Sequence, residues 1–454
     1  MPWKQICCFV FSLVLCSGLA LLDTSASAGE HGKYSLDECV QKALEFSPQI
    51  KEVQHDVEIA ETRLSEVEGA KWVQLESTLL AGPAPDADGN QISSPDSTTK
   101  IHGIGPFGRL DMKAIQPLYT FNKITKGIEA AQHGIRVDQA RVQQKASEVS
   151  LDIKKYYYGI LLATEALRLI DEVDGYIQSA LTRTNKLLAV GPGEVTEQDR
   201  DRLEAYDGIV QKQREEANKN IILAKEALRS FMGVDKSAPF EIEDTKLVPA
   251  KVEIEDIESY IATSKDLRPE FTQLREGLAA REALIKVAEA DYYPTVFAAA
   301  FLSWAEAPDR DRVTNPWIND EFNHFYGGAA LGLQWHFDFG ITKAKVERSR
   351  VEYKKLTKTK DYADVGIPLQ VEKAYQGLVE ARNSINGSEK ASISARKWMV
   401  GAAANYDMGV GDSRDLSDAL VAYGTTKIDY LTSIFNYNME YANLLHATGL
   451  SLRK

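Results

Sequence analysis

The sequence has 454 residues, a formal net charge of −13 and a hydrophobic content of 44%. Nucleic-acid phosphates and anionic membrane surfaces repel so acidic a chain, so neither is an expected partner. The length allows two or three globular domains or one elongated architecture.

The first predicted element is an apolar run near the N-terminus. It follows Lys4, reads ICCFVFSLVLCSGLALL and leads to Ala26-Ser27-Ala28. A basic start, an apolar centre and an A-x-A end predict a secretory signal peptide over residues 1–28. Lipidation at Cys16 is disfavoured, because the bulky Leu15 stands where a small residue is expected. Removal of the segment leaves only Cys39, so no intramolecular disulfide is expected.

The remainder of the sequence contains one pattern twice. Pro48 corresponds to Pro269, and at the same spacing GAKWVQLES corresponds to ADYYPTVFA. Further along, IKKYYYGILLA corresponds to VEKAYQGLVEA. Such spacing predicts a tandem duplication. We expect a first repeat over residues 29–233, an inter-repeat linker or equatorial element over 234–253, and a second repeat over 254–454.

Each copy is predicted to begin with one helix, over residues 35–70 and 255–291. Two strands separated by a polar loop follow. A very long helix comes next, over 122–189 and 340–407, and a helix returns after a Gly-x-Gly turn, over 194–232 and 412–449. Pro368 predicts a kink or break in the second long helix. Apolar residues in the first long helix alternate at spacings of four and three, which favours a coiled coil over ordinary helix packing: Val149, Ile153, Tyr156, Ile160, Ala163, Leu167 and Ile170.

The strand segments have one apolar and one polar face. In AALGLQWHFDF, Leu331 and Leu333 alternate with Gln334 and His336, and in the first copy Leu110 and Met112 alternate with Asp111 and Lys113. This alternation fits a barrel wall between lipid and water, although a soluble antiparallel sheet on a core produces it too. Four strands are too few for a closed barrel, whose smallest common form has about eight. Three chains would supply twelve, which indicates an oligomer.

In this order, duplicated, the segments resemble the TolC-like outer membrane efflux protein family (outer membrane factors). The resemblance covers YSLDECVQKALEFSPQI, AEADYYPTV, IQPLYTF, QWHFDFG and the C-terminal segment from NYDMGVGD onward. It implies a fold of mixed α and transmembrane β-barrel class: a homotrimer with a 12-strand barrel and an α-helical periplasmic tunnel. It also implies export across the outer membrane of a Gram-negative bacterium, with contact to outer-membrane lipid. A periplasmic adaptor and an inner-membrane pump of RND or ABC type would be the partners.

The two predicted helical turns hold the pore and tip candidates. Acidic residues after each turn would form rings at a constricted mouth and favour cations; the alternative is simple capping of the helix N-termini. Arg414 is expected to pair with an acid, and the turn glycines would contact the adaptor, although the first tip, AVGPGEVTEQDRDRL, departs from the family's pattern through Pro192 and its dense charges. The pore and gate candidates are Asp412, Asp415, Arg414, Asp418, Glu194 and Glu197, and the adaptor-contact candidates are Gly191, Gly193, Gly409 and Gly411.

Aromatic residues near the strand ends are candidates for interfacial girdles, with core packing as the alternative. They are Trp72, Tyr293, Trp304, Trp335 and Phe337.

Catalytic patterns are missing from the sequence. It has no H-E-x-x-H, P-loop or G-x-S-x-G motif, so no enzyme, metal or cofactor is expected. The favoured function is the exit duct of a tripartite efflux or type I secretion system, and the family resemblance implies that it is gated by an iris-like loosening at the tip. The alternative is a periplasmic coiled-coil adaptor or scaffold without a membrane barrel.

Overall fold

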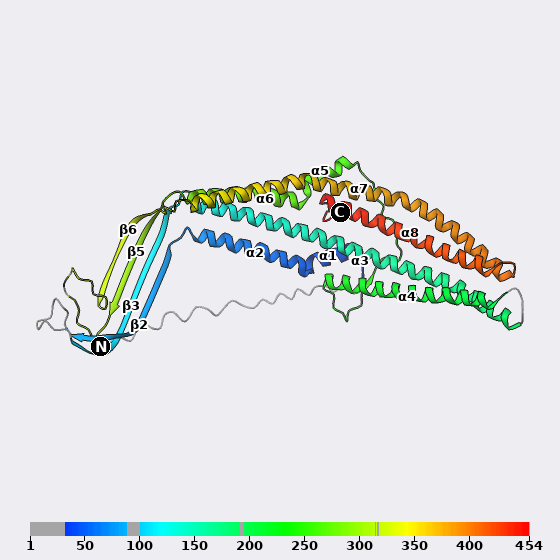
Figure 1. Ribbon diagram of the computed structural model, residues 1–454, viewed down its shortest axis with the longest axis horizontal. Coiled ribbons are helices and arrows are strands. Elements are labelled where there is room, and N and C mark those ends of the chain that lie inside the picture. Colours follow the sequence, from blue (N-terminus) through cyan, green and yellow to red (C-terminus); the bar gives the residue numbers. More distant parts are fainter. Residues whose placement is uncertain (1–31, 89–99, 191–194, 314, 316, 454) are drawn as a thin grey trace.

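The computed structural model describes residues 32–88, 100–190, 195–313, 315 and 317–453. The predicted signal peptide and the candidates Gly191, Gly193 and Glu194 lie outside these residues. The molecule is a long rod of helices with one sheet at its end (Figure 1). Among the described helices, none combines the length and the hydropathy of a membrane-crossing segment.

The two halves contain the same helices in the same order. Helices α2 (Pro48–Gly69) and α6 (Pro269–Ala290) each have 22 residues. The long helices α3 (Lys123–Val190) and α7 (Ile341–Met408) each have 68, and the returning helices α4 (Glu197–Met232) and α8 (Ser413–Thr448) each have 36. At about 1.5 Å per residue, α3 and α7 are each roughly 100 Å long.

The prediction of a single helix at the start of each copy is wrong, because each copy begins with two helices. Helix α1 (Leu36–Phe46) ends before Pro48, and α5 (Ile257–Leu267) ends before Pro269. Each proline occupies the first turn of the next helix, where its missing N–H costs nothing. Ser35 starts α1 with a capping box, in which its hydroxyl accepts from the Glu38 N–H and the Glu38 carboxylate accepts from the Ser35 N–H.

Pro368 does not break α7, which runs continuously from Ile341 to Met408. Figure 1 shows the helix as an unbroken, gently bowed ribbon. Its buried residues Val371 and Leu378 pack with Tyr437 and Leu444 of α8 on the C-terminal side of the proline. Tertiary packing therefore compensates for the single backbone hydrogen bond that proline removes.

Three apolar clusters hold the rod together. Around mid-rod, Ile153 and Tyr157 of α3 pack with Cys39 of α1 and Leu228 of α4. Strands β1 (Lys33–Tyr34) and β4 (Glu241–Ile242) form a short parallel pair beside this cluster. A second cluster joins α5, α7 and α8. The third lies toward the tip and joins α3, α4, α7 and α8 through side chains such as Ile177, Leu203, Met399 and Leu420.

The sheet has four antiparallel strands in the order β2-β3-β5-β6. They are β2 (Gln74–Asp88), β3 (Lys100–Tyr119), β5 (Thr295–Glu306) and β6 (His324–Gln334). In the described part of the chain, β2 and β6 are the two open edges of this sheet. Where β3 and β6 return to the helices, Phe121 and Phe339 take the left-handed conformation, with φ of 48° and 46°. The two halves thus turn from strand to helix in the same way.

Candidate functional site

The two faces of the sheet differ in chemistry, and no helix or second sheet of the described chain covers either face. One face, called the apolar face below, carries Leu79, Leu110, Leu302 and Leu331, which lie on the same side by register. The Leu79 and Leu331 side chains are 70% and 78% exposed. So large an exposed apolar surface marks contact with another protein or with lipid. The opposite face, called the polar face, carries Glu76, Arg109, Asp111, Lys113, Ser303 and His324.

Large rings on the polar face lie flat against the sheet. Phe297 and Phe301 of β5 stand directly opposite Gly332 and Gly328 of β6. A Cβ atom built at Gly332 would lie 2.5 Å from the Phe297 ring, and one at Gly328 would lie 3.0 Å from the Phe301 ring. Each ring therefore occupies the space that a neighbouring side chain would take, the arrangement by which aromatic residues stabilise glycines in strands.

The girdle candidates divide between the two ends of the sheet. Trp72, Tyr293, Trp335 and Phe337 lie where the strands meet the helices, and Trp304 lies at the far end of β5. At the helical end the Trp335 indole donates to the Tyr292 backbone oxygen at 3.1 Å. All five are exposed in the single chain.

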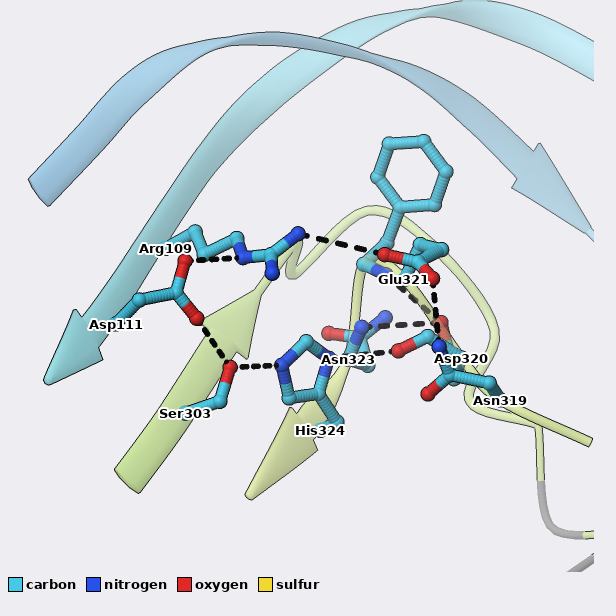
Figure 2. Close-up of polar contacts among 9 residues, drawn as sticks. Arg109, Asp111, Ser303, Asn319, Asp320, Glu321, Asn323 and His324 are labelled. Atoms are coloured by element: carbon cyan, nitrogen blue, oxygen red, sulfur yellow. Dashed lines mark hydrogen bonds and ion pairs between the residues drawn. The ribbon is translucent and has the colours of Figure 1, made fainter. Parts of the chain in front are cut away.

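A polar network ties β3, β5 and β6 together near the far end of the sheet (Figure 2). The Arg109 guanidinium donates to the Asp111 carboxylate at 2.7 Å, and the Ser303 hydroxyl donates to the same carboxylate at 2.6 Å. Ser303 is also 2.8 Å from Nε2 of His324. Nδ1 of His324 lies 2.7 Å from the Asp320 backbone oxygen, which can only accept, so Nδ1 carries a proton. Strand alternation alone did not predict this network.

At the tip of the second half, two of the three acidic candidates accept a hydrogen bond. The Asp412 side chain accepts from the Arg414 backbone N–H at 3.0 Å and so caps α8. Asp415 accepts from the Trp398 indole at 3.0 Å, whereas Asp418 is exposed. The expected pairing of Arg414 with an acid does not form among the described residues, where the Arg414 side chain is exposed.

Backbone conformation and close packing explain why the turn of the second tip has glycine at both positions. Gly409 ends α7 with φ of 81°, the left-handed conformation that favours glycine. A Cβ atom at Gly411 would lie 2.7 Å from the backbone nitrogen of Tyr406. In the first tip, Glu197 of α4 pairs with Arg200 one turn later, at 2.5 Å.

Contacts between the two helical hairpins, α3 with α4 and α7 with α8, were not predicted from the sequence. Glu172 of α3 accepts from the Tyr423 hydroxyl of α8 at 2.7 Å and pairs with Arg396 of α7 at 2.9 Å. Burial, aided by the hydrogen bond to Glu172, raises the pKa of Tyr423 to about 12. The Tyr423 hydroxyl therefore remains a donor at any physiological pH.

A second link lies closer to the tip. The Ser413 hydroxyl of α8 donates to Asp199 of α4, and Arg202 donates to Ser413 at 3.0 Å. Burial opposes the ionisation of Asp199, but hydrogen bonds from Ser413 and Thr196 outweigh it and hold the pKa below its ordinary value. Within the described residues, no cluster of side chains has the composition of a metal site.

Comparison with known proteins gives this architecture a context. Residues 261–450, which span most of the second half, match the family model described as "Outer membrane efflux protein". The first half has helices of the same lengths and order. The second half of the chain is thus similar to outer membrane efflux proteins. The outer membrane protein TolC of Vibrio cholerae is 22% identical over 326 residues, which is 67% of this chain and 70% of that protein.

Solved structures confirm the predicted fold class. The CmeC outer membrane channel of Campylobacter jejuni is 14% identical, with a TM-score of 0.72, and the match covers 92% of this chain and 86% of CmeC. The open state of the MtrE outer membrane channel of Neisseria gonorrhoeae is 16% identical, with a TM-score of 0.72, covering 91% and 89%. The outer-membrane channel OprN is 15% identical, with a TM-score of 0.74, covering 91% and 89%.

Proposed function

We propose that three copies of this chain form a passive exit duct across the outer membrane of a Gram-negative bacterium. The observation that carries the proposal is the sheet, whose two edges are open and whose apolar face is exposed while its other face is charged. Twelve such strands close a barrel with lipid outside and water inside. The long helices leave the sheet on one side only and would continue the duct into the periplasm (Figure 1).

The aromatic residues at the two ends of the sheet support this placement. From Tyr293, just before β5, to Trp304 near its far end, the extended chain spans roughly 28 Å at about 3.3 Å per residue and a tilt near 40°. That height is close to the apolar band of about 25 Å in outer-membrane barrels, which aromatic girdles border on both sides. We infer that the helix-proximal aromatic residues lie at the periplasmic interface and Trp304 at the outer one.

Energy for export would come from elsewhere, because a duct of this kind only supplies a path. We infer that a periplasmic adaptor contacts the tips of the helical hairpins and links them to an inner-membrane pump of RND or ABC type. The turns at Gly409 and Gly411, with Gly191 and Gly193 in the first half, are the proposed contact points. The match of residues 261–450 to the model described as "Outer membrane efflux protein" supports an efflux duct, and the related role in type I protein secretion is the alternative.

The proposed gate is the tip, where α3 and α4 meet α7 and α8. The links through Glu172 and Asp199 hold the two hairpins together, so their release would let the second hairpin swing outward. The acids Asp412, Asp415, Asp418, Glu194 and Glu197 are proposed to line the mouth.

Membrane fractionation followed by conductance measurement tests the function. The mature protein should fractionate with the outer membrane, need detergent for extraction, and form channels of low conductance when added to planar bilayers. Recovery of the folded protein in the soluble periplasm would support the adaptor or scaffold alternative instead.

A further inference from the structure

The segment between β5 and β6 folds back over the polar face of the sheet. Its described parts, residues 307–313, 315 and 317–323, are called the exit loop below. Consecutive polar-face residues of β3 each contact one residue of this loop. The Phe322 ring lies edge-on to the Phe107 ring with centroids 5.5 Å apart, and Glu321 accepts from Arg109 at 3.4 Å.

Gly105, the next polar-face position of β3, shows how closely the loop approaches the strand. A Cβ atom at this position would lie 2.5 Å from the Asp309 carboxylate and 2.8 Å from the Asp309 Cβ. No residue larger than glycine fits without displacing the loop. By contrast, a Cβ atom at Gly103, on the same face of the same strand, would meet nothing within 4 Å.

The exit loop continues across β3 to the far end of β2. The Ala87 N–H donates to the Asp309 oxygen and the Asp311 N–H donates to the Ala87 oxygen, both at 3.2 Å. The Arg310 guanidinium donates to the Pro85 oxygen at 2.7 Å and stacks 4.0 Å from the centre of the Phe322 ring. Ala84 and Ala87 are only 2% and 4% exposed as a result, although most of β2 is open to solvent.

Internal hydrogen bonds give the loop a fixed shape. One Asp320 carboxylate accepts from the backbone N–H groups of Val313, Phe322 and Asn323 at 2.9 to 3.0 Å. Asn323 is buried and accepts from the Ala307 N–H at 2.9 Å. His324 fastens the Asp320 backbone to Ser303, as Figure 2 shows. The loop is therefore a preorganised element and not a flexible connection.

We propose that the exit loop forms a fixed outer constriction that limits the size of the solutes leaving the duct. The inference rests on the proposed function, in which the polar face lines the channel, so that a loop packed on this face occupies the channel. Symmetry would place three copies around one exit. Gly105, Arg310 and Phe322 are then residues that determine which solutes pass, at the end of the rod opposite the proposed gate.

Cysteine labelling of intact cells tests the proposal. Lys113→Cys places a thiol on the polar face, four residues closer to the helices than Arg109, and Met112→Cys places one on the apolar face. Membrane-impermeant maleimides coupled to polyethylene glycols of increasing mass are applied from outside. The unsubstituted chain, in which Cys39 is free and buried, provides the blank.

Gly105→Ala in the Lys113→Cys chain should displace the exit loop, so that the introduced thiol reacts with larger reagents than before. Gly103→Ala is the matched control and should leave the size limit unchanged. Phe322→Ala, which removes both ring contacts without crowding the strand, is the second test variant and should shift the limit in the same direction. An unchanged limit in both the Gly105→Ala and the Phe322→Ala chains would overturn the constriction.

Failure of the proposed function has a different signature. A soluble sheet would expose both faces to water, so the smallest reagent would label the Met112→Cys chain as fast as the Lys113→Cys chain. In a duct, lipid protects the thiol on the apolar face, and the smallest reagent labels only the Lys113→Cys chain.

Discussion

Phe297 and Phe301 are large apolar residues on the face of the sheet that is proposed to meet water. Because the residues opposite them on β6 are glycines, the two rings pack over the β6 backbone instead of projecting away from the sheet. A side chain at Gly332 would push the Phe297 ring away from the strand and into the proposed channel. At the scale of single residues, the missing side chains of Gly328 and Gly332 on β6 therefore shape the polar face as much as the charged residues on β3 do.

At the second tip, the effect of acidic charge on ion selectivity can be tested separately from the structural hydrogen bonds that the acids make. Asp412→Asn and Asp415→Asn together remove two charges but keep the hydrogen-bond acceptors, because asparagine is as good an N-cap as aspartate. If the acids form a ring at the mouth, the double variant should lose cation selectivity in planar bilayers, measured as a shift of the reversal potential in a salt gradient, with little change in stability. An unchanged reversal potential would leave Asp412 with helix capping alone and Asp415 with its hydrogen bond from Trp398 alone.

The first tip makes a prediction about pH. The pKa of Asp199 is lowered in the folded protein, so its ionised form stabilises the link to Ser413 above the ordinary carboxylate pKa of about 3.9. That contribution is lost as the pH falls through the lowered value. Conductance at the tip should therefore rise only in strong acid. In the Asp199→Asn chain the link is uncharged at every pH, and persistence of the same acid-induced rise there would assign it to another group.

At the scale of elements, the two helical hairpins form a pair held by few polar contacts. Glu172 connects α3 with both α7 and α8. Glu172→Gln should weaken the ion pair with Arg396 by less than about 1 kcal/mol, because both side chains are partly exposed, while it also weakens the charged hydrogen bond to Tyr423. We expect a higher single-channel conductance with an unchanged trimer.

Glu165 offers the matched control for this variant. It lies on the same helix and pairs with Arg168 one turn away, within α3 alone. Glu165→Gln should therefore leave the conductance unchanged. If Glu172→Gln and Glu165→Gln behave alike, the contact between hairpins does not hold the gate.

Local patterns allowed the long helices and the turn between α7 and α8 to be predicted from the sequence, because heptad spacing and glycine positions act within a few residues. Proline was the main source of error: Pro48 and Pro269 begin helices, and α7 passes through Pro368. The polar contacts between the two helical hairpins could not be predicted from such local patterns. Glu172 and Tyr423 are 251 residues apart, and only the folded arrangement brings them together.

At the scale of the whole molecule, the single chain leaves surfaces that a trimer would cover. Helix α7 exposes a row of apolar residues at helical spacing, namely Tyr362, Val365 and Leu369. On α4, Ile209, Ile222 and Leu223 are likewise exposed. In the proposed trimer the sheet closes through its open edges β2 and β6, so each chain would meet its neighbours by two different surfaces, which is the head-to-tail contact of a closed ring.

Val365→Glu tests whether the row on α7 is buried between chains. A charge placed in an apolar interface without a partner costs several kcal/mol, so the trimer should dissociate or fail to assemble in mild detergent. Gln370→Glu adds the same charge to the same helix at an exposed position outside the row and should leave the trimer intact. Light scattering coupled to size-exclusion chromatography measures both. A trimer of normal stability in the Val365→Glu chain would mean that this face of α7 meets water, and assembly would then rest on the strand edges and on α4.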